Sequence, residues 1–166
     1  MRTALLALLA ILPATLAQTG PEWDAFYKKQ TEFRKQGAEA LRRERGRRKA
    51  DLCSNSPNGA VGISVCLADE LKTTEANYLA YVRSIGALLR LGPPDGDHPA
   101  TGRSVARLPF DDAESIWQSY REKACAAAMA QWQGGSIVQT AQKSCLLDLT
   151  WDHIDELANL YQDLWH

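Results

Sequence analysis

The sequence predicts an all-α protein, a small antiparallel helical bundle of about four helices stapled by two disulfides. Three observations predict this fold class. Apolar residues recur with a helical period over four long stretches of the chain. No stretch shows the alternation of apolar and polar residues that a half-buried strand requires. The chain also has four cysteines, and an even number is typical of a disulfide framework in an exported protein.

Residues 1–17 are expected to be a cleaved signal peptide. Arg2 gives a positive start, and residues 4–12 form an apolar run that is too short to cross a bilayer. Pro13 ends this run, and the small residues Thr15 and Ala17 suit a signal peptidase. A membrane anchor is the alternative, but the sequence has no second apolar stretch of about 18 residues and no cysteine near the cleavage site to carry a lipid. We therefore expect a periplasmic or secreted protein without a transmembrane segment.

The mature chain would contain 149 of the 166 residues, which suits one domain with a hydrophobic core. Its charge is unevenly distributed. Residues 18–52 carry ten Lys or Arg against six Asp or Glu, whereas residues 53–166 carry eight against fourteen, so the two parts have net charges of +4 and −6. We expect a basic N-terminal helix over 18–52 and a disulfide-bonded helical domain over 53–166. The acidic domain disfavours nucleic acid and favours a cationic protein as partner.

The first helix is predicted from residue 21 to about residue 50. Pro21 suits a first turn, and one face carries Trp23, Phe26, Phe33 and Leu41. Its basic end at residues 42–49 is interpreted as a solvated surface, with contact to an anionic envelope surface or nucleic acid as the alternative. The pattern leaves open whether this helix packs on the bundle or extends from it.

A loop is predicted over residues 54–64, because Ser, Asn, Gly and Pro dominate its composition. The central core helix should follow from Cys66 to about Leu91, with an apolar stripe made of Leu67, Leu71, Tyr78, Tyr81, Val82, Ile85 and Leu89. Residues 92–97 end it, and a long polar loop should continue to about Pro109. Loops of this length often bind partners, which makes Asp95, Asp97 and His98 candidate partner contacts.

The third helix is predicted to begin near Asp111 or Asp112 and to end before Gly134. Its inward residues should be Ile116, Trp117, Tyr120, Ala124, Ala127 and Ala128. Ser136 suits the N-cap of a last helix that continues almost to the C-terminus. The inward residues expected there are Val138, Ala141, Cys145, Leu149, Ile154, Leu157, Tyr161 and Leu164.

The four cysteines allow three disulfide connectivities. We favour Cys53 with Cys66 and Cys125 with Cys145, because each bridge closes a modest local loop and would stabilise the fold by about 3 kcal/mol. A zinc site is the alternative, but the spacing includes no Cys-x-x-Cys and no paired His.

The sequence does not indicate an enzyme or a cofactor. His98, His153 and His166 have no metal-ligand spacing, and no nucleophile elbow or phosphate-binding loop is present. Neighbouring carboxylates at 69–70, 111–112 and 155–156 are interpreted as caps and solvated residues. An uncharacterised hydrolase stays as a third hypothesis, which two converging carboxylates in one pocket would favour.

Several motifs occur in order along the chain. The strongest is Trp117-x-x-Tyr120-Arg121-x-x-x-Cys125, followed by Gly134-Gly135-Ser136 and by Cys145 with Leu149-Thr150. Cys53 and the segment Cys66-Leu67-Ala68-Asp69-Glu70-Leu71, with Tyr78 and Tyr81, precede them. Together these motifs resemble the LprI-type lysozyme inhibitor family of bacterial envelope proteins. The chain has His153 where the family tends to place an Arg, and the helix at 21–50 is an addition.

The resemblance implies a non-catalytic exported protein that acts by protein–protein binding, with a basic lysozyme as its partner. A structural or adaptor protein of the periplasm without lysozyme-inhibiting activity is the alternative. Trp117, Tyr120 and Arg121 are candidate partner contacts, although Trp and Tyr at helical spacing usually belong to the core. Arg121 would then pair with a carboxylate on a neighbouring helix.

Overall fold

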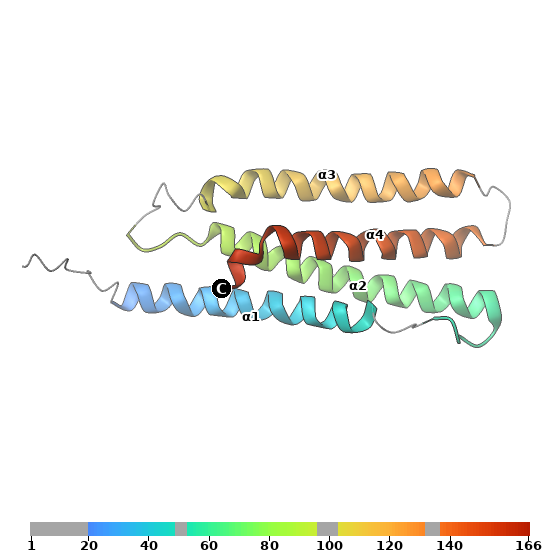
Figure 1. Cartoon of the computed structure of the whole chain (residues 1–166), viewed down its shortest axis with the longest axis horizontal. Coiled ribbons are helices and arrows are strands. Elements are labelled where there is room, and N and C mark those ends of the chain that lie inside the picture. Colours follow the sequence, from blue (N-terminus) through green and yellow to red (C-terminus); the bar gives the residue numbers. More distant parts are fainter. Residues whose placement is uncertain (1–19, 49–52, 96–102, 132–136) are drawn as a thin grey trace, which may run out of the picture.

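Four long helices run up, down, up and down along an elongated bundle in the computed structural model (Figure 1). The structure describes residues 20–48, 53–95, 103–131 and 137–166. These residues contain no strand, so the predicted all-α fold class is confirmed. The elements are α1 (Pro21–Arg48), α2 (Gly59–Arg90), α3 (Arg103–Ala130), α4 (Val138–Leu160) and a final short 3-10 helix, η1 (Gln162–Trp165).

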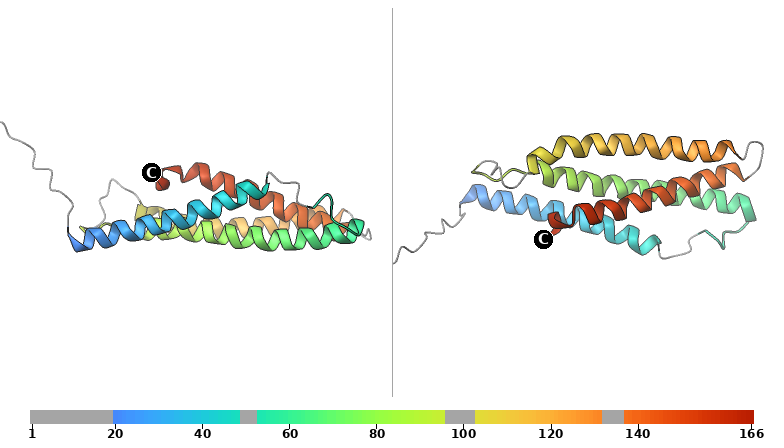
Figure 2. Two further views of the ribbon diagram at one scale, coloured as in Figure 1. Left: turned by 90° about the horizontal axis from the view of Figure 1, so that it is seen from below. Right: turned by 45° about the horizontal axis from the view of Figure 1, so that its top comes forward.

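Helix α2 is the centre of the bundle and packs against each of the other three long helices. Figure 2 shows α4 crossing the bundle at an angle, from the side of α3 to the side of α1. Helix α1 lies along α2 rather than extending away from the other helices, which settles the placement that the sequence left open. Its predicted span from residue 21 to about 50 agrees with the observed helix.

The hydrophobic core follows the predicted stripe of α2. Tyr78, Tyr81, Ile85 and Leu89 are buried, as predicted, and Leu88 joins them. The other helices complete the core with Ala40, Phe110, Ile154, Leu157 and, from η1, Leu164. Burial of this shared apolar surface is the main stabilising contribution to the bundle.

Both predicted disulfides are present. Cys53 and Cys66 are joined with their Cα atoms 5.7 Å apart, and Cys125 and Cys145 have the same Cα separation. The first bridge ties the turn before α2 to the side of that helix, and the second ties α3 to α4.

The predicted loop at 54–64 is too long, because α2 already begins at Gly59. Asn58 and Gly59 have φ angles of 69° and 56°, so two successive left-handed residues turn the chain into the helix. Gly62 then lies against the carbonyl oxygen of Pro57, where a Cβ atom would collide. Gly59 and Gly62 therefore belong to the first turns of α2, although a segment rich in glycine is typical of a loop.

The predicted start of the third helix is also wrong, because α3 begins at Arg103 and contains Pro109. A proline in a helix removes one backbone hydrogen bond and costs about 3 kcal/mol. Phe110 offsets this cost, since it is only 3% exposed and packs edge-on against Tyr161 at a ring distance of 5.3 Å. The predicted N-cap of the last helix, Ser136, lies outside the described residues.

The inward face predicted for the third helix is partly wrong. Ile116, Tyr120 and Ala127 are exposed, whereas Trp117, Ala124 and Ala128 are half-buried. The most buried positions of α3 are Phe110, Glu114, Arg121 and Cys125. They are four, seven and four residues apart, so they lie on one face of the helix. Two of these are charged, and a search for apolar periodicity does not detect a buried face that contains charges.

Helix α1 and η1 approach each other at Gly37. A Cβ atom at this position would lie 2.6 Å from Cζ3 of Trp165 and 3.0 Å from Cβ of Ser84. The ring of Trp165 also stacks on Tyr81 with centroids 5.4 Å apart. The absence of a side chain at Gly37 therefore allows the C-terminal tryptophan to reach the core.

Candidate functional site

The centre of the bundle contains a cluster of buried polar side chains around Arg121. Its guanidinium donates hydrogen bonds to Oγ1 of Thr150 at 2.9 Å and to Oε1 of Glu75 at 3.0 Å. The same group lies 5.4 Å from the ring centre of Trp117, on the same helix. Arg121 therefore joins α2, α3 and α4, and pairs with a carboxylate on a neighbouring helix as expected.

His153 extends this cluster on the other side of Trp117. The two rings stack with centroids 4.0 Å apart, and Nε2 of His153 lies 3.0 Å from Oε1 of Glu114. The hydroxyl of Tyr78 donates to the other oxygen of Glu114 at 2.6 Å. Burial, with the hydrogen bond to Glu114 as the second cause, raises the pKa of Tyr78 and keeps the hydroxyl a donor.

We call these seven side chains the central polar cluster: Glu75, Tyr78, Glu114, Trp117, Arg121, Thr150 and His153. A hollow of about 200 Å³ borders it between α2 and α3 and is lined partly by Leu79 and Gln118. Buried polar groups that are paired in this way fix which helix faces meet. The geometry of the central polar cluster is that of an interhelical clamp.

A second polar junction connects α1 to the rest of the bundle. Glu44 is only 2% exposed, yet its carboxylate accepts hydrogen bonds from Thr74 at 2.9 Å, Asn77 at 2.5 Å and Trp151 at 3.0 Å. Nε of Arg47 lies 3.2 Å from the same carboxylate. A buried carboxylate is tolerated when donors surround it, so Glu44 sets the register of α1 against α2 and α4.

The basic end of α1 forms ion pairs with other helices, which the sequence did not predict. Arg47 pairs with Glu70 on α2. Arg48 lies 2.6 Å from Asp152 and 2.5 Å from Asp155 on α4. The basic run is therefore partly neutralised by α2 and α4 and is not simply a solvated helix end.

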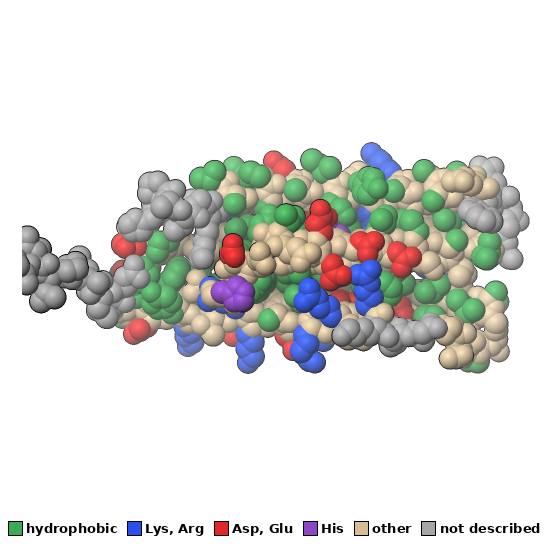
Figure 3. All heavy atoms as spheres, in the orientation of Figure 1, with side chains coloured by type: hydrophobic (Ala, Val, Ile, Leu, Met, Phe, Trp, Pro, Cys, Tyr) green, Lys and Arg blue, Asp and Glu red, His purple; other side chains and the backbone are tan. Residues whose placement is uncertain are grey.

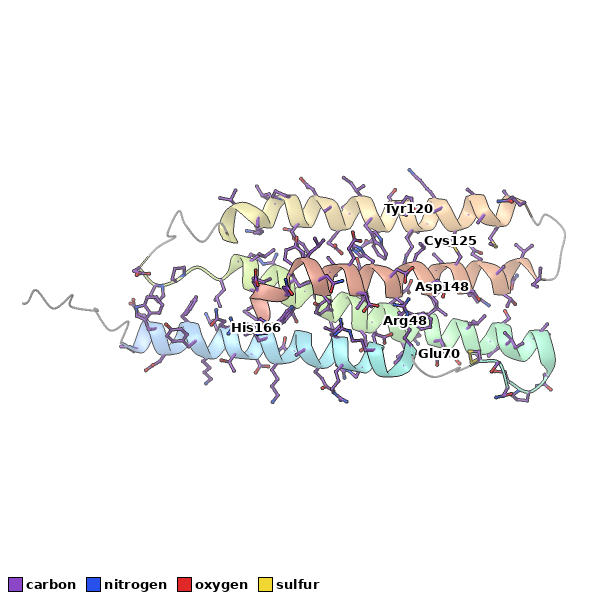
Figure 4. All side chains as sticks on the ribbon, viewed as in Figure 1. Arg48, Glu70, Tyr120, Cys125, Asp148 and His166 are labelled. Atoms are coloured by element: carbon purple, nitrogen blue, oxygen red, sulfur yellow. A yellow bond between two sulfur atoms is a disulfide. The ribbon has the colours of Figure 1, made fainter. Side chains whose placement is uncertain are left out.

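Acidic side chains gather on the exposed face of α4 and η1 (Figure 3). We call this surface the α4 acidic stripe, and it consists of Asp148, Asp152, Asp155, Glu156 and Asp163. Figure 4 shows Asp148 on α4 near Arg48 at the end of α1. Burial first, and then the charge of Asp152, raise the pKa of Asp148, while Arg48 lowers it. Arg45 and Arg48 neutralise part of this stripe by pairing with Asp152 and Asp155, and the remaining exposed carboxylates favour a positively charged partner.

The structure separates the six candidate partner contacts. Trp117 is half-buried and Arg121 is buried, both within the central polar cluster, whereas Tyr120 points away from it and is 58% exposed. Asp95 is exposed after the end of α2. Asp97 and His98 lie outside the described residues.

Sequence reasoning missed Glu44, Glu114 and His153 as members of buried networks. A signal existed for Glu114, because it precedes Trp117 by three residues and Arg121 by seven, and so shares their helix face. Glu44 had no such signal, since its donor Trp151 is 107 residues away along the chain.

Within the described residues, no group of three or more His, Cys, Asp or Glu side chains could hold a metal ion. The same part of the chain has no helix with the length and apolarity needed to span a membrane.

The fold and these polar layers define a disulfide-linked four-helix bundle whose helices are joined by buried, paired charges. More particularly, the chain belongs to the LprI lysozyme inhibitor family, because the family model described as "Lysozyme inhibitor LprI" matches residues 53–157. This span covers α2 and α3 and most of α4, while α1 precedes it. No curated protein and no solved structure matches the chain.

Proposed function

We propose that this chain is an exported bacterial envelope protein, periplasmic or secreted, that inhibits lysozyme by binding it and performs no catalysis. Membership of the LprI family over residues 53–157 is the observation that carries this proposal. The two disulfides support export, because such bonds persist in oxidising compartments.

The contact surface that we propose is the α4 acidic stripe. Lysozymes of the animal type are strongly basic, so an acidic surface would both steer their approach and complement their charge. The net charge of −6 over residues 53–166 acts in the same direction. Asp95, which follows the end of α2, is proposed as a second contact together with Asp97 and His98.

The direct test uses residues 18–166, purified with both disulfides formed, and measures lysozyme turnover of cell walls with this protein in excess. We expect slower turnover and, by calorimetry, binding that weakens as the salt concentration rises. Unchanged turnover together with no binding at low salt would refute the proposal.

The contact surface is tested by Asp148→Lys combined with Asp163→Lys. Both side chains are exposed. The ion pairs that join Arg48 of α1 to α4 are made by Asp152 and Asp155 and stay intact, so the fold should persist. We expect lysozyme affinity to fall by roughly tenfold or more, because charges at an interface rim govern encounter with a basic partner. Asp69→Lys on α2 is the matched control, since it changes the charge of an exposed Asp outside the stripe. An equal effect of the control would place the contact elsewhere, and Asp95→Asn with Asp97→Asn then tests the second contact.

An envelope adaptor without lysozyme-inhibiting activity is the second candidate function. The exposed side of α1 presents Lys28, Lys29 and Lys35, and basic side chains project from this edge in Figure 3. A groove of about 580 Å³ between α1 and α2 also contains Arg83 and Arg90. Replacing the three lysines with Gln should abolish co-purification with an envelope partner, and unchanged co-purification would contradict this function.

A further inference from the structure

The outer face of α3 carries four large apolar side chains that no other part of the described structure covers. Val105 is 77% exposed, Leu108 and Ile116 are each 69% exposed, and Tyr120 is 58% exposed. We call these four residues the α3 stripe, and Figure 3 shows hydrophobic side chains along this edge of the molecule. Contiguous exposed apolar surface on a soluble protein marks an interaction site.

The charges on this face have a specific spacing. Asp112 and Lys123 are both exposed. They lie eleven residues apart in one helix, which is about three turns or about 16 Å, so both point to the same side as the α3 stripe. Asp112 and Lys123 lie at equal distances from the bond between Trp117 and Gln118, so an antiparallel second copy centred on that bond would meet each charge with the opposite one.

We propose that a second copy of this chain covers the α3 stripe, with the two α3 helices antiparallel and a two-fold axis passing beside the bond between Trp117 and Gln118. This register places each Asp112 opposite Lys123 of the second copy. A two-fold interface requires that every contact occur twice, and the spacing of this pair meets that condition.

The same register matches side-chain sizes across the axis. Leu108 falls opposite Ala127 of the second copy, Val105 opposite Ala130, and Ile116 opposite Ser119. All three small residues are exposed. Large side chains opposite small ones allow two helices to approach closely, so the pattern favours close packing over a loose contact.

The charge pattern favours a second copy over the other occupants of an apolar helix face. A basic lysozyme would select an acidic surface, and an anionic membrane would select a basic one. Asp112 and Lys123 cancel each other on this face. The dimer leaves the α4 acidic stripe out of the contact, so it would form whether or not the protein binds lysozyme.

Sedimentation equilibrium of residues 18–166 over a range of concentrations tests the dimer. We expect Asp112→Lys and Lys123→Asp each to raise the dimer dissociation constant by about tenfold, because each turns two attractions into two repulsions. The double variant should restore the wild-type constant, since it exchanges the partners. A monomeric wild type at all concentrations, or a double variant weaker than either single variant, would overturn the proposal.

Apolar contact is tested by Ile116→Glu, which should abolish the dimer, with Val61→Glu as the matched control. Val61 is 71% exposed on α2, so its substitution should leave the dimer unchanged. A zero-length carbodiimide cross-link between Asp112 and Lys123, found by mass spectrometry in the covalent dimer, would support the register, because the two residues are too far apart within one helix to react. A dimer that forms without this cross-link and survives Ile116→Glu would refute the α3 interface.

Discussion

The buried charges of this bundle define its packing residue by residue. Glu44 and Glu114 are 2% and 6% exposed, and each accepts hydrogen bonds from side chains of other helices. Such groups contribute little when paired and cost much when a partner is lost. Their value is specificity, because a shifted helix would leave the carboxylate without donors.

Replacing Glu44 with Ala should lower the free energy of unfolding by about 3 kcal/mol, because Thr74, Asn77 and Trp151 would lose their common acceptor. Glu44→Gln, which keeps one oxygen acceptor, should cost less. Guanidinium unfolding followed by circular dichroism measures both changes. The control is Glu39→Ala on the same helix, where only surface pairs with Arg42 and Arg43 are lost. Equal losses for Glu44→Ala and Glu39→Ala would contradict the buried role.

Gly37→Ala should destabilise the protein by roughly 1–3 kcal/mol, because the new methyl group would collide with the ring of Trp165. Gly46→Ala in the same helix should instead stabilise it by about 0.5–1 kcal/mol, since open space surrounds that position and Ala favours a helix. Thermal unfolding of the two variants measures these opposite signs. Stabilisation by both substitutions would mean that Trp165 does not pack against α1.

At the scale of the helices, the sequence predicts which segments are helical better than where they begin. Apolar periodicity identifies all four helices, and the stripe of α2 from Tyr78 to Leu89 is the observed core. Gly59 and Pro109 mislead because each is a helix breaker in isolation, whereas in the fold Gly59 provides a left-handed turn and Phe110 anchors the turns around Pro109. Local composition does not contain these tertiary contacts.

The candidate site is less predictable than the helices. The two disulfides follow from cysteines that close short local loops. For Arg121 the sequence predicts only the kind of partner, a carboxylate on a neighbouring helix, and not Glu75, which lies 46 residues away on α2. The donors of Glu44 come from α2 and α4, so their convergence depends on how α1 docks. The outward direction of Tyr120 depends on α3 lying at the edge of the bundle, which its own sequence does not reveal.

Pro109→Ala should raise the free energy of unfolding by roughly 1–2 kcal/mol. The substitution restores a backbone hydrogen bond within α3, and this gain exceeds the entropy returned to the unfolded chain. Denaturant unfolding measures the change. Pro57→Ala provides the control, because Pro57 precedes α2 and should give no such gain. A destabilised Pro109→Ala variant would show that α3 does not continue through residue 109.

For the whole molecule, stability should decline in alkali. Burial raises the pKa of Tyr81 from 10.0 to about 12, and burial also raises the pKa of Tyr78. A folded pKa above the unfolded one gives stability that is complete below pH 10 and is lost as the pH rises toward 12. Tyr81 alone should account for a loss of about 2 kcal/mol.

Denaturant unfolding between pH 8 and pH 12 measures this decline, and Tyr81→Phe should make it shallower. The comparison is between slopes with pH, so any change in stability at neutral pH does not affect it. A Tyr81→Phe variant with the wild-type slope would exclude this tyrosine as a cause.

The docking of α1 has a consequence for how the span matched by the family model relates to the packed bundle. The family match begins at residue 53. Two residues of α1 that precede it belong to the packed interior: Glu44, which accepts hydrogen bonds from Thr74, Asn77 and Trp151, and the core residue Ala40. A fragment limited to the family span would expose one flank of its own central helix to water. The span that the family model matches is therefore shorter than the packed bundle, and α1 covers a flank of α2 that the matched span alone would leave open.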